Sequence, residues 1–258
     1  MEKVIEVQNL SLTYHSKTCE TLALENLSFD IFRGEFVSIV GPSGCGKTTI
    51  LSLIAGLLQP SSGTVLVNSS PPSLKSNQCG YMFQRDNLLP WRSIEKNVLL
   101  GLEVQGKNTK ENKALALNLL DKYGLGEFKR KRPDELSGGM RQRVALIRTL
   151  ALNPSILLLD EPFSALDYQT RLNVCDDVAN IIKQEKKTAL LVTHDLQEAI
   201  SMSNRILVLT KRPATIKAIY KLDFESSLTP FQKRQLPEAK TLFNKLWGEI
   251  QDEEKQLF

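Results

Sequence analysis

Residues 36–49 read FVSIVGPSGCGKTT, a short apolar run followed by a glycine-rich turn. The run 36–40 is typical of a strand that is buried on both faces. The turn fits the pattern G-x-x-x-x-G-K-[ST], in which backbone N–H groups wrap around phosphates. A helix-compatible stretch, 47–58, follows and would add the positive end of its dipole. The sequence therefore predicts a phosphate-binding loop between a buried strand and a helix.

The pattern assigns a role to two side chains of this loop. Lys47 is expected to reach the β- and γ-phosphates, and the Thr48 hydroxyl is expected to bind Mg²⁺. The Cys45 thiol lies where positive potential could lower its pKa, but we interpret it as a variable position and not a nucleophile. A glycine-rich hairpin is the alternative, which the flanking strand and helix disfavour. The loop residues expected to bind nucleotide are Gly41, Pro42, Ser43, Gly44, Cys45, Gly46, Lys47, Thr48 and Thr49.

A second motif, ILLLDE at 156–161, ends an apolar run in two acids. Buried strands rarely finish in paired carboxylates unless a cation or a reaction requires them. Asp160 suits a Mg²⁺ ion that keeps much of its water shell. Glu161 would act as general base for a water that attacks the γ-phosphate. The alternative, two solvated loop acids, is disfavoured by the phosphate loop in the same chain.

Hydrophobic patterning indicates an α/β fold whose strands return through helices, which implies parallel βαβ units. Strands are expected at 4–10, 22–32, 36–40, 156–159 and 188–193. Helices are expected at 93–105, at 109–124, after Ser137 up to Asn153, and at 172–186. The helical block, about 85–154, is expected to be an insertion between two parts of the sheet.

Composition excludes several classes of protein. The 258 residues are 41% hydrophobic and 24% charged, which is ordinary for a globular chain. No apolar run approaches the roughly 18 residues of a membrane span, and the scattered cysteines argue against disulfides. The formal net charge of +4 is weak, and the basic run 129–132 is interpreted as a solvated loop. We therefore expect a reduced intracellular protein that does not bind nucleic acid.

The segment 136–140, LSGGM, precedes a helix that is rich in arginine. A capping serine followed by two glycines exposes backbone N–H groups and could bind an anion. The residues alone leave open whether this is an anion site or a capped helix start.

With these motifs in this order, the sequence resembles the ATP-binding subunit of an ABC transporter over nearly all of residues 1–220. The resemblance implies a P-loop (RecA-like) core with a parallel-rich sheet, an antiparallel β subdomain and an inserted α-helical subdomain, about 85–154. A tail, 221–258, would follow. Its Ala239, Phe243, Leu246 and Ile250 suggest an amphipathic helix.

The resemblance also implies site roles. Ser137, Gly138 and Gly139 would contact the nucleotide of a second copy of the chain, and the loop 164–167 would run along that seam. Gln84 would touch Mg²⁺ and sense the γ-phosphate. His194 would be the switch histidine, although a lone histidine is more often a surface group. Tyr14 would stack on adenine, although an aromatic near a strand end more often packs.

A narrower resemblance lies in residues 87–98, NLLPWRSIEKNV, and 211–213, KRP. Both are similar to the ATPases of importers for nitrate, sulfonates, taurine and related solutes. This implies membrane permease subunits as partners, a solute-binding protein acting indirectly, and a peripheral place on the cytoplasmic face of the membrane. We expect Trp91, with Leu88 and Leu89, to line a groove for a permease helix. The alternative is that Trp91 packs the helical lobe against the sheet.

Three other classes carry similar motifs. DNA-repair and chromosome-structure ATPases separate them with long coiled-coil arms, for which the interval from Gln84 to Ser137 is too short. Ribosome-associated factors carry two cassettes, but the phosphate loop occurs once here. A soluble ABC-type ATPase that serves as an assembly scaffold remains the alternative, and co-purification of a membrane subunit would distinguish the two.

Overall fold

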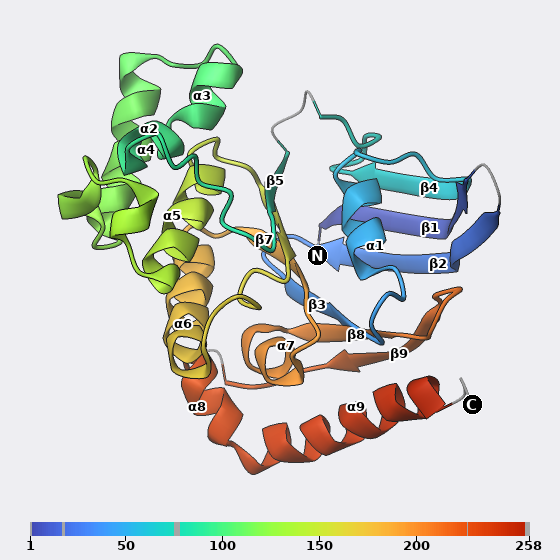
Figure 1. The fold of residues 1–258 in the computed structure, drawn as a ribbon. Helices are drawn as coiled ribbons and strands as arrows, with labels where there is room; N and C mark the ends of the chain where they lie inside the picture. The colour runs from blue at the N-terminus through green and yellow to red at the C-terminus, as the bar shows by residue number, and fades with distance from the viewer. Residues whose placement is uncertain (1, 17–18, 75–77, 226, 256–258) are drawn as a thin grey trace. The chain divides into compact units, whose positions relative to one another are not determined.

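The computed structural model describes residues 2–16, 19–74, 78–225 and 227–255 (Figure 1). These described parts divide into two compact units. The first unit comprises residues 1–78 and 188–258, and the second unit comprises residues 79–187.

The first unit contains an antiparallel sheet in the order β2-β1-β4 (Figure 1). Its strands are β1 (Lys3–His15), β2 (Glu20–Phe32) and β4 (Ser62–Val67). The alternating pattern that predicts a strand at 22–32 is confirmed, and β2 begins two residues earlier. Asn9 and Asn26 break the alternation at shifts of register, with left-handed φ angles of 48° and 50°. Asparagine tolerates this conformation better than most residues.

The same unit contains strands in the order β7-β3-β8-β9. They are β3 (Phe36–Val40), β7 (Thr188–Val192), β8 (Arg205–Leu209) and β9 (Ile216–Lys221). β3 pairs in parallel with β7 and β8, and β9 is antiparallel to β8. Every residue of β3 and β7 is buried, as the apolar runs predict. The loops that follow β3 and β7 therefore leave the same edge of the sheet.

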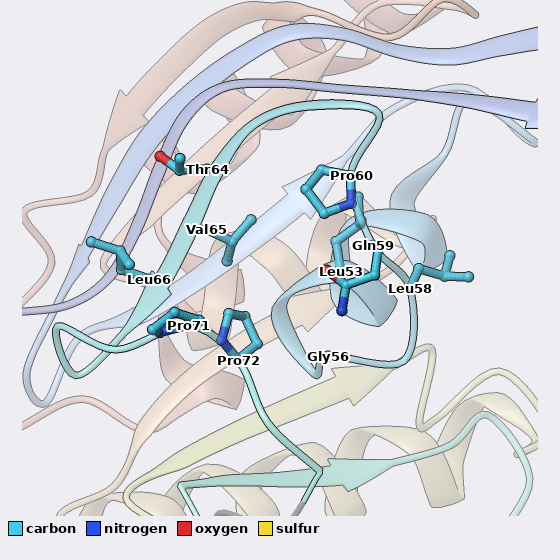
Figure 2. Close-up of a pocket in the computed structure, with 10 residues that line it drawn as sticks. All are labelled: Leu53, Gly56, Leu58, Gln59, Pro60, Thr64, Val65, Leu66, Pro71 and Pro72. Atoms are coloured by element: carbon cyan, nitrogen blue, oxygen red, sulfur yellow. The ribbon is translucent and has the colours of Figure 1, made fainter.

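Helix α1 (Lys47–Ile54) is shorter than the predicted 47–58. It ends because Gly56 takes a φ of 75°, the left-handed glycine stop that closes many helices. A Cβ on Gly56 would lie 3.2 Å from the backbone of Pro72. A cavity of about 250 Å³ lies beside this stop, and its lining comes from the end of α1, from β4 and from three prolines (Figure 2). These contacts fix the far end of the helix that begins at the phosphate loop.

The remaining helices of this unit are α7 (Leu196–Met202), α8 (Pro230–Gln235) and α9 (Pro237–Lys255). α9 is the long red helix of Figure 1, and it confirms the predicted amphipathic tail. Ala239 and Leu246 are buried in one cluster with Ile206 and Val208 of β8. The tail is therefore part of the hydrophobic core of the first unit.

The second unit pairs β5 (Cys79–Met82) in parallel with β6 (Ile156–Asp160). Its helices are α2 (Ile94–Val98), α3 (Leu100–Val104), α4 (Lys110–Lys122), α5 (Gly138–Leu150) and α6 (Tyr168–Gln184). Short 3₁₀ turns occupy Gly126–Phe128 and Pro133–Glu135. The predicted helices are confirmed, with two differences.

The stretch 93–105 forms two short helices that adjoin at Leu99, whose own backbone is helical. α6 begins at Tyr168, four residues before the predicted Leu172, because Asp167 caps it. The Asp167 carboxylate accepts a hydrogen bond from the Thr170 N–H at 3.0 Å. The basic run 129–132 is partly paired, since Lys129 and Lys131 bridge to Asp121 and Glu135.

Candidate nucleotide site

The phosphate loop has the predicted setting, between buried β3 and the start of α1. Two of its glycines have positive φ angles, 70° at Gly44 and 120° at Gly46. A Cβ on Gly46 would also lie only 2.7 Å from Cδ2 of Leu24 in β2. Other residue types would therefore strain the loop at this position.

Lys47 is 6% exposed, although its side chain carries a charge. Its Nζ donates hydrogen bonds to the carbonyl oxygens of Gly41 and Pro42, both at 2.9 Å. The Lys47 side chain therefore folds back over the loop. Its ammonium group is held beside the backbone that is expected to bind phosphate.

The cysteines differ sharply in environment. Burial raises the pKa of the Cys45 thiol, and the nearby Lys47 charge only partly opposes this effect. The lowered pKa considered from the sequence is therefore wrong, and Cys45 is not an activated nucleophile. Burial likewise raises the pKa of Cys79 to about 12. Cys175 is buried and Cys19 is exposed.

Tyr14 lies near the end of β1, and its hydroxyl is 3.0 Å from Oγ1 of Thr49. This contact places the side chain at the first turn of α1, next to the loop. The tyrosine remains 43% exposed, so it can still stack on a flat ligand.

His194 follows β7 and is exposed. The turn that carries it is fixed on both sides. Thr193 donates its hydroxyl to the Glu198 carboxylate at 2.6 Å, and Asp195 caps α7 by accepting from the Gln197 N–H at 2.8 Å. The turn therefore presents the imidazole from a rigid support.

In the second unit, the predicted acids stand at the end of β6. Asp160 is 8% exposed, and the Tyr81 hydroxyl of β5 donates to its Oδ2 at 3.0 Å. Glu161 adopts a left-handed backbone, with a φ of 45°. That conformation is unusual for glutamate and is found preferentially at functional sites.

The side chain of Gln84 lies next to that of Glu161. Its Nε2 donates to Oγ of Ser164 at 3.1 Å and lies 3.5 Å from Oε2 of Glu161. The Ser164 hydroxyl in turn donates to the Glu161 carbonyl at 3.0 Å. Sequence reasoning assigned no such contact to Ser164 or to Tyr81. The pairing of β5 with β6 was the missing information.

Ser137 caps α5, since its hydroxyl accepts from the Met140 N–H at 3.3 Å. The two glycines after it have a packing role that sequence reasoning missed. A Cβ on Gly139 would lie 2.8 Å from Cγ2 of Val174, on α6. A Cβ on Gly138 would lie 3.2 Å from Cδ2 of Leu166. Both glycines thus let the start of α5 approach α6 and the loop before it.

The predicted residues therefore fall into two groups. The first unit holds the phosphate loop, Tyr14 and His194. The second unit holds Gln84, the Asp160–Glu161 pair and the capped start of α5.

Comparison with protein families gives one matching model, described as ABC transporter, which covers residues 24–164 and so more than half of the chain. The chain belongs to the ABC transporter family. A relative from Bacillus subtilis, the uncharacterized ABC transporter ATP-binding protein YtlC, is 51% identical over 98% of this chain and 97% of its own length. The taurine import ATP-binding protein TauB of Yersinia pestis is 40% identical over 86% of this chain and 85% of its own.

Solved structures agree with this placement. A dimeric ATP-binding cassette, MJ0796, in a post-hydrolysis state with ADP and phosphate, superposes with a TM-score of 0.72 at 33% identity, covering 86% of this chain and all of that one. CbiO1 of Clostridium perfringens, part of the ABC transporter complex cbiONQ, superposes with a TM-score of 0.77 at 25% identity, covering 95% of each chain. This ABC transporter protein is therefore an ATPase with the α/β cassette fold. No helix among its described residues is long and apolar enough to cross a membrane.

Proposed function

We propose that this ABC transporter ATPase powers the import of a small solute of the nitrate, sulfonate or taurine type through a separate permease. The observation that carries the ATPase part is the buried Lys47 ammonium over a glycine loop at a helix start. The 40% identity to a taurine import protein supports the solute class. The resemblance of segments 87–98 and 211–213 to the ATPases of this importer group also supports this solute class.

ATP binding is assigned to the phosphate loop. Phosphate oxygens would take the Lys47 ammonium from the carbonyls of Gly41 and Pro42, because charge-assisted bonds are stronger than neutral ones. Backbone N–H groups at the start of α1 would complete the cradle. Tyr14, held by its contact with Thr49, would stack on the adenine.

Mg²⁺ is assigned to the Thr48 hydroxyl, the Gln84 side-chain carbonyl and the Asp160 carboxylate. Within the described residues, no group of three or more His, Cys, Asp or Glu could hold a metal. The assigned donors are instead a mixed set of oxygens, which suits Mg²⁺, a hard ion that keeps several of its waters. Asp160 is held by Tyr81, so one of these donors is fixed in orientation. When bound, the ion would neutralise phosphate charge.

Hydrolysis is assigned to Glu161, acting as general base on the attacking water. The backbone of Glu161 is left-handed and its carbonyl accepts from the Ser164 hydroxyl, while the Gln84 side chain lies 3.5 Å from the carboxylate at the end of β6. His194, on its rigid turn, would act as the switch histidine, and Gln84 would sense the γ-phosphate. Lys47 would neutralise charge on the transferring group.

The cassette is proposed to work as a pair of copies. Ser137, Gly138 and Gly139 would bind the nucleotide held by the other copy, and the loop 164–167 would lie along the shared seam. MJ0796, the cassette compared above, is dimeric. Closing and opening of the pair would drive the permease at the cytoplasmic face of the membrane, with a solute-binding protein acting indirectly.

The permease is proposed to dock around Trp91. This tryptophan is 70% exposed, so the alternative in which it packs the helical lobe is wrong. Leu88 lies mostly in the lobe core, 7% exposed, and also lines a cavity of about 430 Å³ with Arg85 and Gly138. Trp91 and Leu89 do not line this cavity, so the expected groove of all three residues is not formed, and the docking proposal rests on the exposed tryptophan, a residue type that often anchors protein interfaces.

The catalytic assignment is tested with Glu161→Gln, which keeps the shape of the side chain but removes the base. We expect ATP binding to persist and turnover to fall about 10²- to 10⁴-fold. Glu127→Gln, an exposed glutamate of the same unit, is the matched control. Turnover near the parent level in Glu161→Gln, measured as phosphate release, would exclude the assigned base.

The transport assignment is tested by purification from detergent-solubilised membranes. Recovery of a multi-spanning permease, with ATPase activity that responds to its solute, is expected. A complex with soluble partners alone would favour the scaffold ATPase.

A further inference from the structure

The loop between β8 and β9 is held firmly against β2. The Ala214 N–H donates to the Ala23 carbonyl at 2.9 Å, and the Glu25 N–H donates to the Ala214 carbonyl at 3.0 Å. The Thr210 N–H closes the base of the loop on the Thr215 carbonyl at 3.0 Å. The backbone of this loop is therefore fixed on both of its sides.

Arg212, in this loop, contacts the phosphate loop. Its Nη2 donates to the Gly44 carbonyl at 2.7 Å. The N–H at the other end of the same peptide group, that of Cys45, donates to the Pro42 carbonyl at 3.3 Å. The Gly44–Cys45 peptide is thus held at both of its polar atoms, and one of these bonds is charge-assisted. Its orientation matters because Gly44 has a positive φ and no side chain to restrict it.

The residue before Arg212 is held in turn by the tail helix. Glu253 of α9 is 7% exposed, and its Oε2 accepts from the Lys211 N–H at 3.2 Å. Its Oε1 pairs with Nζ of Lys217 at 2.8 Å. Burial alone would raise the pKa of Glu253, but the Lys217 ammonium and the Lys211 N–H hold that pKa below its usual value. The carboxylate is therefore charged near neutral pH and can hold the backbone beside Arg212.

We propose that Arg212 is a positioning residue of the phosphate loop, and that Glu253 of the C-terminal helix in turn positions Arg212. In this arrangement the tail sets the affinity of the loop for nucleotide, through one peptide group and without itself touching phosphate. The assignment rests on the proposed role of the loop as the site of the ATP phosphates.

The first experiment compares the ATP dissociation constants of Arg212→Ala and Arg212→Lys, together with their melting temperatures. Arg212→Ala is expected to bind ATP about three- to fivefold more weakly, the loss typical of an exposed charged hydrogen bond. Arg212→Lys keeps the charge but not the planar fork, so it is expected to recover the affinity only partly. Both melting temperatures should stay near that of the parent, because Arg212 is exposed.

Two controls separate positioning from net charge and from the site itself. Lys221→Ala removes another exposed positive charge, in β9, and should leave ATP affinity unchanged. If Arg212→Lys bound ATP as tightly as the parent, or if Lys221→Ala lost as much ATP affinity as Arg212→Ala, the positive charge alone would explain the effect. Either result would refute the positioning role. Lys47→Ala reports on the proposed site. If it binds ATP normally, the site assignment fails, whereas a loss there with none in Arg212→Ala overturns only the present proposal.

The second experiment is a double-mutant cycle with Glu253→Ala. Alone, this change is expected to weaken ATP binding about twofold, because the backbone beside Arg212 loses one of its hydrogen bonds while Arg212 itself remains. In the Arg212→Ala background it should cause no further loss of ATP affinity, because the proposed route from Glu253 to the loop runs through Arg212. An equal loss in both backgrounds would show that Glu253 does not act through Arg212. Glu253→Gln, which keeps the side-chain shape, serves if the alanine variant does not fold.

Discussion

At the scale of single residues, Lys47 combines two demands that usually exclude each other, burial and charge. Its ammonium is satisfied by carbonyl oxygens of the loop that it belongs to. Glu161 shows a related feature, because its backbone takes a conformation that few glutamates adopt. Lys47 is held by backbone carbonyls, whereas Glu161 is contacted by the Gln84 and Ser164 side chains. Both residues lie in short segments that the sequence identifies.

Lys47→Ala is expected to weaken ATP binding about 10- to 100-fold, since a hydrogen bond to a charged group contributes roughly 1.5–3 kcal/mol. The change also leaves the Gly41 and Pro42 carbonyls without their cation. Titration with ATP measures the effect, and Lys240→Ala, an exposed lysine of the same unit, is the control. Unchanged affinity would mean that the loop does not bind the phosphates.

At the scale of elements, the start of α5 depends on close packing against α6. The glycines after Ser137 are usually considered for their exposed N–H groups, but Gly139 is also a contact point between two helices. Packing of this kind carries no local sequence signal beyond the glycine itself.

Gly139→Ala is expected to lower stability by about 1–3 kcal/mol, because its Cβ would lie 2.8 Å from a methyl carbon of Val174. Gly248→Ala is the matched control, since a Cβ on Gly248 meets nothing within 4 Å. That change should stabilise α9 by about 0.5–1 kcal/mol through helix propensity. Thermal unfolding measures both effects. Equal melting temperatures for the two variants would contradict the packing role.

At the scale of the whole molecule, the exposed Trp91 is proposed to join the ATPase to its permease. Trp91→Ala should leave the melting temperature and basal ATPase activity nearly unchanged, and it should weaken assembly with the permease, measured by co-purification. Trp247→Ala makes the same change on the tail helix, at a tryptophan that is 50% exposed, and should not affect assembly. A large fall in the melting temperature of Trp91→Ala, with normal assembly, would contradict the interface proposal.

Much of this architecture could be predicted because its signals are local. Fully buried strands such as β3 appear as apolar runs, and the caps Ser137 and Thr109 precede their helices. The α1 boundary was predicted too late, because the stop at Gly56 depends on its backbone conformation. The bond from Glu253 to Lys211 joins residues 42 positions apart, and no spacing rule relates them. Contacts between distant segments need the fold itself.

The burial of the cysteines has a consequence for chemical labelling. A thiol reacts with alkylating reagents as its thiolate, so a raised pKa and a covered sulfur both slow the reaction. Cys45 and Cys79 have raised pKa values, and Cys175 is buried, whereas Cys19 is exposed near the start of β2. A fluorophore can therefore be attached at Cys19 in the natural sequence. Its fluorescence could then be followed during ATP titration, while Cys45 in the phosphate loop stays unlabelled.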